Sequence, residues 1–273
     1  MHAGGMINGE MLTNTHQAYK YWRDKGESMF EFDICRTDDG EYVTTHDFKP
    51  NYFQKRRIDP IPDTLSAEWF LSQNLFFNDK GPFQAMNLRY ILFELLQKHI
   101  DQVMLDPKDF TFKGTLLFLD YIAKELNCLK IEPEQIVIEL YNPDMIAASR
   151  QYPMRVVYQY CVDDDIQQGN SSESRNLPNE DLIDYLNDNG IHVVSYPWKQ
   201  AVENLPLLKL LIDNDFIVYS RTRNNIFHDL LEQTKISVNI VDEVLTEREM
   251  LNLQLYKKKY IAKYQERIND FFL

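Results

Sequence analysis

The chain has 273 residues, of which 44% are hydrophobic and 13% aromatic, and its formal net charge is -13 at pH 7. This acidic balance argues against nucleic-acid binding through the overall field, because phosphate recognition usually depends on excess Lys and Arg. No stretch has the unbroken apolar length of a membrane helix, and three widely spaced cysteines favour reduced thiols over disulfides or a zinc cluster. We therefore expect a cytoplasmic protein, for the chain as written, with one large core.

Short apolar runs alternate with helical segments along the chain, which is typical of βα units and of a barrel-type α/β domain. We predict seven strands, at residues 29–34, 42–46, 102–106, 136–141, 155–160, 191–196 and 215–219. Helices are expected at residues 13–26, 86–99, 114–127, 143–152, 179–190 and 199–214. The pattern predicts a single domain over residues 1–273.

The stretch "FEFDICRTDDGEYVTTHD" places two acids inside an apolar strand. Alternate side chains of a strand point to opposite faces, so Glu31 and Asp33 share one face. "DDG" predicts a tight turn, and the second strand ends at His46. Two adjacent carboxylates repel each other, so solvent, a cationic side chain or a divalent metal must lie between them. The alternative interpretation is an edge strand with a polar face exposed to water.

Two segments depart from the βα alternation. Residues 48–86 are aromatic and too long for a simple connection, so we interpret them as an insertion that covers part of the protein. Residues 222–273 are interpreted as a C-terminal helical extension with mixed charges on its exposed side, suited to packing or to a homo-oligomer contact.

A second acidic strand end lies in "DQVMLDPKDF", where Asp106 and Lys108 share a face by period two. Catalytic residues of a parallel barrel come from the C-terminal ends of several strands. Because Glu31, Asp33, His46 and Asp106 all lie at or near such ends, we expect them to lie close together. An acid at a strand end is by itself more often a solvated turn.

In this order, "HAGG", "LTNT", "EFD", "DDG", "THD" and "DPK" resemble the motifs of the glycerophosphodiester phosphodiesterase family. The family opens on His-Arg-Gly and continues through Glu-Asn-Thr, Glu-x-Asp, Asp-Gly, His-Asp and Glu-x-Lys. The resemblance implies a TIM-type (β/α)8 barrel and a phosphoric diester hydrolase of lipid metabolism. It is specific over residues 2–47 and weaker at residues 106–108. "IHVVSYPW" resembles a late barrel strand, which marks Trp198 as a substrate contact or a core residue.

The sequence departs from the family at four places. Ala3 stands where the family usually has Arg, and Thr13 stands where it has Glu, so a cation and an anion are lost together. Asp106 replaces Glu with a shorter side chain. The family has a strand before its first histidine, whereas only Met1 precedes His2 here, so the first of the eight strands is expected to be missing or truncated. We expect either a gap beside residues 29–34 or its filling by another segment, with His2 poorly anchored.

The resemblance implies a divalent cation, Mg or Ca, held by Glu31, Asp33 and Asp106. His2 and His46 would act as general acid and base, and Lys108 would contact the phosphate. The predicted function is metal-dependent hydrolysis of a glycerophosphodiester or a similar small alcohol phosphodiester. One alternative is a phospholipase C-like lyase that forms a cyclic phosphate, and another is a barrel that binds a phosphoryl ligand without turnover.

Overall fold

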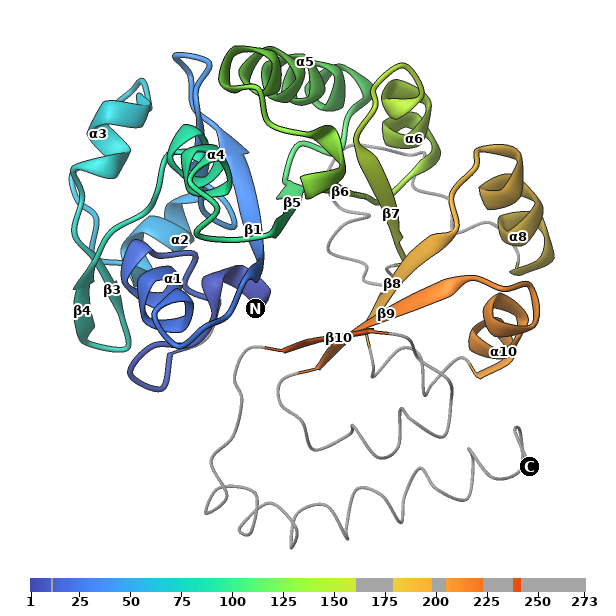
Figure 1. Cartoon of the computed structure of the whole chain (residues 1–273). Helices are drawn as coiled ribbons and strands as arrows, with labels where there is room; N and C mark the ends of the chain where they lie inside the picture. The colour runs from blue at the N-terminus through green and yellow to red at the C-terminus, as the bar shows by residue number, and fades with distance from the viewer. Residues whose placement is uncertain (11, 161–178, 198–204, 223–237, 242–273) are drawn as a thin grey trace, which may run out of the picture. The chain divides into compact units, whose positions relative to one another are not determined.

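The computed structural model describes residues 1–10, 12–160, 179–197, 205–222 and 238–241 (Figure 1). The chain divides into two compact units, one of residues 1–140 and 144–156 and one of residues 141–143 and 157–273. No helix among the described residues is long and apolar enough to cross a membrane.

All seven predicted strands are confirmed. They are β1 (Met29–Arg36), β2 (Tyr42–Thr44), β5 (Gln102–Pro107), β6 (Ile136–Leu140), β7 (Arg155–Gln159), β8 (Val193–Pro197) and β9 (Ile217–Thr222). The six predicted helices are also present, as α1 (His16–Arg23), α4 (Leu88–Leu96), α5 (Phe112–Leu129), α6 (Pro143–Ser149), α8 (Asn179–Asp188) and α10 (Leu205–Asp213). Helix α5 is longer than predicted by two residues at each end, and the other five are shorter.

In the first unit the sheet order is β2-β1-β5-β6. β1 is parallel to β5, which is parallel to β6, whereas β2 returns antiparallel along β1 after the predicted Asp-Gly turn. The second unit contains the greater part of β7, followed in order by β8, β9 and β10 (Val238–Val241), with parallel pairing from β7 to β10. β10 is a strand inside the range predicted as a helical extension, and the other residues from 223 onward lie outside the described ranges.

The two faces of β1 have different surroundings. Phe30 and Phe32 lie 4.9 and 6.0 Å from the ring of Tyr19, measured between centroids, so this face packs on α1. Glu31 and Asp33 point to the opposite face, and both are buried. The β1 segment is therefore not an edge strand with a wet polar face, because helix α1 covers one side and the acids of the other side are enclosed.

Met1 lies beside β1, where the sequence predicts a missing strand. Its amino group donates to the Met29 carbonyl at 2.5 Å, and its own carbonyl accepts from the Glu31 amide at 2.8 Å. The next residues form the short 3-10 helix η1 (His2–Gly4). The expectation that His2 is poorly anchored was wrong, because backbone hydrogen bonds on both sides of Met1 hold this segment against β1.

Residues 48–86 form a hydrophobic core together with Val43 of β2. They form α2 (Pro50–Lys55), α3 (Ala67–Leu71) and the antiparallel strands β3 (Leu75–Phe77) and β4 (Lys80–Phe83). Ile7, from the loop that follows η1, packs against this core. In the same loop, Glu10 accepts from Asn78 at 2.7 Å and pairs with Lys80 at 2.9 Å. The segment therefore supports the loop that begins at His2.

Glu94 of α4 is 5% exposed and ties α4 to α1. Its Oε2 accepts from the Tyr19 hydroxyl at 2.6 Å and from the Arg23 guanidinium at 2.7 Å. His99 Nδ1 lies 3.2 Å from the same oxygen. Burial raises the pKa of Glu94, but these hydrogen bonds outweigh it and hold the pKa below its ordinary value of 4.5.

The change Glu94→Gln is expected to lower the free energy of unfolding by about 1–3 kcal/mol at pH 7, because charge-assisted hydrogen bonds are lost. A carboxylate with a depressed folded-state pKa stabilises above its unfolded-state pKa and loses that effect as the pH falls. The difference from wild type should therefore shrink below about pH 4.5. Urea denaturation at several pH values measures it. Asp213→Asn, which removes the exposed pair with Lys209, is the control and should have little effect.

Candidate active site

Three carboxylates converge on one face of the first unit's sheet. The parallel register places Asp33 of β1 directly opposite Asp106 of β5, and Glu31 lies two residues before Asp33. Glu31, Asp33 and Asp106 are 1%, 3% and 0% exposed, and one oxygen from each lies within 4.8 Å of the others. The predicted convergence of these three acids is therefore present in the structure.

Protein groups hold specific oxygens of each acid. The Ala3 amide donates to Glu31 Oε2 at 2.6 Å, and the Asn14 side-chain amide donates to Asp33 Oδ2 at 2.6 Å. The Lys108 ammonium bridges two acids, at 2.7 Å from Asp33 Oδ1 and 2.6 Å from Asp106 Oδ2. Lys108, which the sequence predicts as a phosphate contact, thus contacts two members of the acidic cluster, and its side chain is 11% exposed.

Electrostatic interactions favour the ionised form of Asp33. Burial raises the pKa of its carboxyl, but the charge of Lys108, followed by those of His46 and His2, holds the pKa well below its ordinary value. The fields of Lys108 and of the two histidines thus have the same sign at this carboxylate when the imidazoles are protonated.

The two histidines approach the acids from different segments. His2 Nε2 lies 3.6 Å from Glu31 Oε2, and its side chain is 16% exposed. His46 follows β2, where the Thr45 amide donates to the Asp33 carbonyl at 3.0 Å. His46 has a 60% exposed side chain, and its Nδ1 lies 3.4 Å from Asp47 Oδ2. One histidine is thus enclosed beside an acid, and the other is accessible to solvent and oriented by a neighbouring carboxylate.

The backbone around His2 requires small residues. Ala3, Gly4 and Gly5 all have positive φ, and a Cβ on Gly5 would lie 2.3 Å from Trp22 Cδ1. The Trp22 indole also donates to the Met6 carbonyl at 2.7 Å, which keeps the ring against this segment. The "HAGG" sequence therefore allows the chain to turn closely over α1 after His2.

Gly5→Ala is expected to displace the His2 segment, because the new methyl group would overlap the Trp22 ring and Ala disfavours this φ. Because the resemblance implies a catalytic role for His2, turnover of a phosphodiester is expected to fall by about tenfold or more when this segment moves. Gly26→Ala is the control: Gly26 also has positive φ, but a Cβ there meets nothing within 4 Å. Equal turnover in the two variants would contradict the positioning role of Gly5.

The donor set suits a hard divalent cation. Three buried carboxylates within 4.8 Å offer only oxygen ligands, the type that Mg²⁺ and Ca²⁺ prefer. Zinc and copper sites are usually richer in nitrogen and sulfur, so the residues favour the predicted Mg or Ca.

Two positions at which the sequence departs from the family motifs, Ala3 and Thr13, are buried without a charge. Ala3 is fully buried, and Thr13 is 1% exposed, with its hydroxyl 3.0 Å from that of Thr15. Neither position carries a charge that requires compensation. Trp198, the predicted aromatic substrate contact, lies outside the described residues.

Two residues near the cluster were not assigned a role from the sequence. Asn14 lies in the quoted "LTNT" motif and binds Asp33 through its side chain. Glu139 of β6 is fully buried, and by period two it lies on the same face as Val137, whose register partner is Met104. The signal for Glu139 was a single acid in the apolar run "IVIEL".

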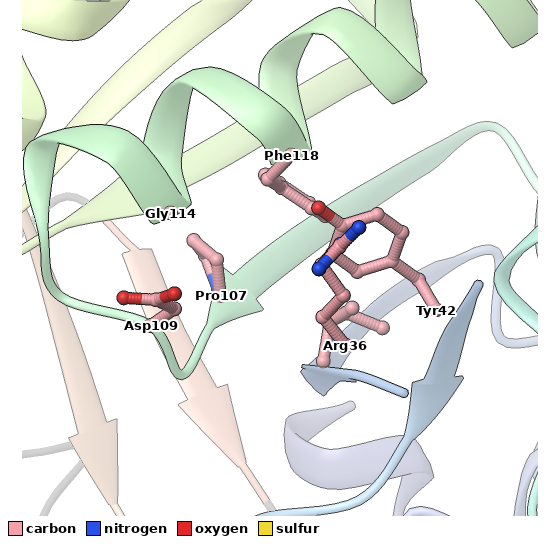
Figure 2. A pocket seen from close by; sticks show the side chains of 7 residues that line it. Arg36, Tyr42, Pro107, Asp109, Gly114 and Phe118 are labelled. Atoms are coloured by element: carbon pink, nitrogen blue, oxygen red, sulfur yellow. The ribbon is translucent and has the colours of Figure 1, made fainter. Parts of the chain in front are cut away.

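A small pocket lies apart from the acidic cluster, at the start of α5 (Figure 2). Its cavity of about 10 Å³ has room for about one water molecule, so it is not a substrate site. Asp109 fills the space beside Gly114, where a Cβ would lie 2.0 Å from the Asp109 carboxyl carbon. The lining residues in Figure 2 therefore belong to the packing of α5 on β1 and β2.

Comparison with known proteins identifies the fold. No family model matches the sequence, and no curated protein matches it. Among solved structures, a candidate glycerophosphoryl diester phosphodiesterase from Silicibacter pomeroyi is 16% identical, with a TM-score of 0.66 and 88% of each chain covered. A glycerophosphodiester phosphodiesterase from Parabacteroides distasonis is 12% identical (TM-score 0.62; 95% of this chain and 93% of that chain covered). A phosphodiesterase from Oleispira antarctica, solved with the product sn-glycerol-3-phosphate, is 13% identical (TM-score 0.63; 88% and 91% covered).

These likenesses confirm the predicted fold class, a TIM-type α/β barrel, which the chain shares with solved glycerophosphodiester phosphodiesterases. The resemblance first indicated by short motifs thus extends over most of the chain at the level of the fold.

The acidic cluster is expected to bind Mg²⁺ or Ca²⁺ and to stabilise the folded protein. At 100 times the dissociation constant, binding contributes about 2.7 kcal/mol, which for a chain of this size raises the melting temperature by about 5–10 °C. Thermal unfolding with and without each cation measures the shift. Glu31→Gln should abolish it, whereas Glu68→Gln, on α3, should preserve it.

Proposed function

We propose that this protein is a metal-dependent phosphodiesterase that hydrolyses a glycerophosphodiester or a similar alcohol phosphodiester. The observation that carries the proposal is the enclosure of Glu31, Asp33 and Asp106 within 4.8 Å of one another. His2 Nε2 lies 3.6 Å from Glu31 Oε2, and His46 follows Thr45, whose amide donates to the Asp33 carbonyl at 3.0 Å. The fold shared with glycerophosphodiester phosphodiesterases supports this reaction class.

Glu31, Asp33 and Asp106 would hold the divalent cation, and Lys108 keeps two of them in place. When bound, the cation supplies positive charge that offsets the charge developing on the phosphoryl oxygens. Lys108 brings a second positive charge to the same face, as the resemblance implies for a phosphate contact. Trp198 is proposed as an additional substrate contact.

His2 and His46 would divide the two proton transfers of hydrolysis. One histidine removes a proton from the attacking water, and the other donates a proton to the leaving alcohol. Asp47 orients His46 through its contact with Nδ1, so Nε2 is the nitrogen available to the reacting group. Glu31 and the Met1 backbone place His2.

Substrate preference is expected to differ from that implied by the family motif. Ala3 presents no guanidinium to the phosphate, so one bidentate phosphate contact is lost. Sn-glycerol-3-phosphate, which is present in the Oleispira antarctica structure, marks glycerophosphodiesters as the first substrates to test. Analysis of the products separates hydrolysis from lyase chemistry, because the lyase releases a cyclic phosphate.

His46→Ala is expected to lower turnover by about a hundredfold or more, because a general acid or base typically contributes 10²–10⁴-fold. The measurement is a screen of glycerophosphodiesters with Mg²⁺, with Ca²⁺ and with a chelator. His192→Ala is the control, since His192 is exposed and lies in the other unit. The proposal fails if wild type shows no cation-dependent turnover, and His46 leaves the mechanism if its variant is as active as wild type.

A further inference from the structure

Asn14 binds Asp33 at two points. Its side-chain Nδ2 donates to Asp33 Oδ2 at 2.6 Å, and its Oδ1 accepts from the Asp33 backbone amide at 3.0 Å. Asn14 is 1% exposed, so water does not compete for either hydrogen bond. These two contacts fix both the carboxylate of Asp33 and the section of β1 that carries it.

The backbone of Asn14 contacts both histidine segments. Its amide donates to the carbonyl of Ala3 at 2.9 Å, one residue after His2. Its carbonyl accepts from the Thr44 hydroxyl at 2.7 Å, two residues before His46. One residue thus joins the segment of His2, the acid Asp33 and the segment of His46.

Asparagine has the properties that this position requires. The side chain must donate to a carboxylate and accept from a backbone amide at the same time, which the asparagine amide does and an ionised aspartate does not. The backbone has φ 53, a left-handed conformation that asparagine adopts more readily than most residues. Glycine would allow this backbone conformation but would make neither side-chain contact.

We infer that Asn14 is the positioning residue of this site: it orients Asp33 for the cation and sets the spacing between the cation ligands and the two histidines. The inference rests on the proposed function for its consequences in turnover. Its effect on cation affinity follows from the contacts with Asp33 alone. Groups that orient metal ligands typically change metal affinity or activity by 10–100-fold when they are lost.

Asn14→Gly separates the side chain from the backbone, because it preserves the positive φ and removes both contacts with Asp33. The dissociation constant for Ca²⁺, measured by isothermal titration calorimetry, is expected to rise by about tenfold or more. With a glycerophosphodiester as substrate at saturating Ca²⁺, kcat should fall while KM changes little, because Asn14 orients catalytic groups. Asn14→Ser is a second variant with a small polar side chain, and the same direction is expected.

Asn87→Ala is the matched control. Asn87 also accepts from a backbone amide through its side chain, at the start of α4, and no described contact joins it to the acids. It should lower the melting temperature and leave Ca²⁺ affinity unchanged. If both folded Asn14 variants bind Ca²⁺ as tightly as wild type, or if wild type does not bind Ca²⁺, the inference is overturned. If wild type binds Ca²⁺ without hydrolysing any diester while Asn14→Gly binds it more weakly, the proposed function fails and the positioning role is supported.

Discussion

The mutual repulsion of three buried carboxylates is the constraint on which this structure depends. Glu31, Asp33 and Asp106 lie within 4.8 Å of one another, and charges in such an enclosed place are costly unless opposite charge and hydrogen bonds surround them. The groups around the acids supply this positive charge and these hydrogen bonds. Lys108 bridges two acids, the Ala3 amide binds the third, and the two histidines add charge when protonated.

The surrounding backbone is shaped to deliver these partners. The chain bends closely at Ala3, Gly4 and Gly5, where the backbone has positive φ, so that the Ala3 amide reaches Glu31 directly after His2. The Asp-Gly turn then returns β2 along β1 and brings the segment before His46 level with Asp33. The core of residues 48–86 holds the loop after η1 through Ile7, Glu10 and Lys80. This core therefore supports the loop that follows His2.

The sequence predicted much of the fold because its signals are local. Period-two alternation identified the strands and put Glu31 and Asp33 on one face, and the strand end at Asp106 supplied the third acid. Contacts between distant residues were less accessible. Met1 binds β1 through backbone hydrogen bonds that no side chain reveals, and the short β10 lies in a region with helical composition. Asn14 stood inside a recognised motif, but its role depends on contacts with residues 11 to 30 positions away in the sequence.

The central claim is that the three acids form one divalent-cation site in a phosphodiesterase barrel. Anomalous diffraction from crystals soaked in Mn²⁺ tests it most directly, because Mn²⁺ accepts the same oxygen ligands as Mg²⁺ and is located by its own signal. The account predicts an anomalous peak within coordination distance of Glu31, Asp33 and Asp106. An ordered cluster without such a peak, while Mn²⁺ occupies only other places on the protein, would contradict it.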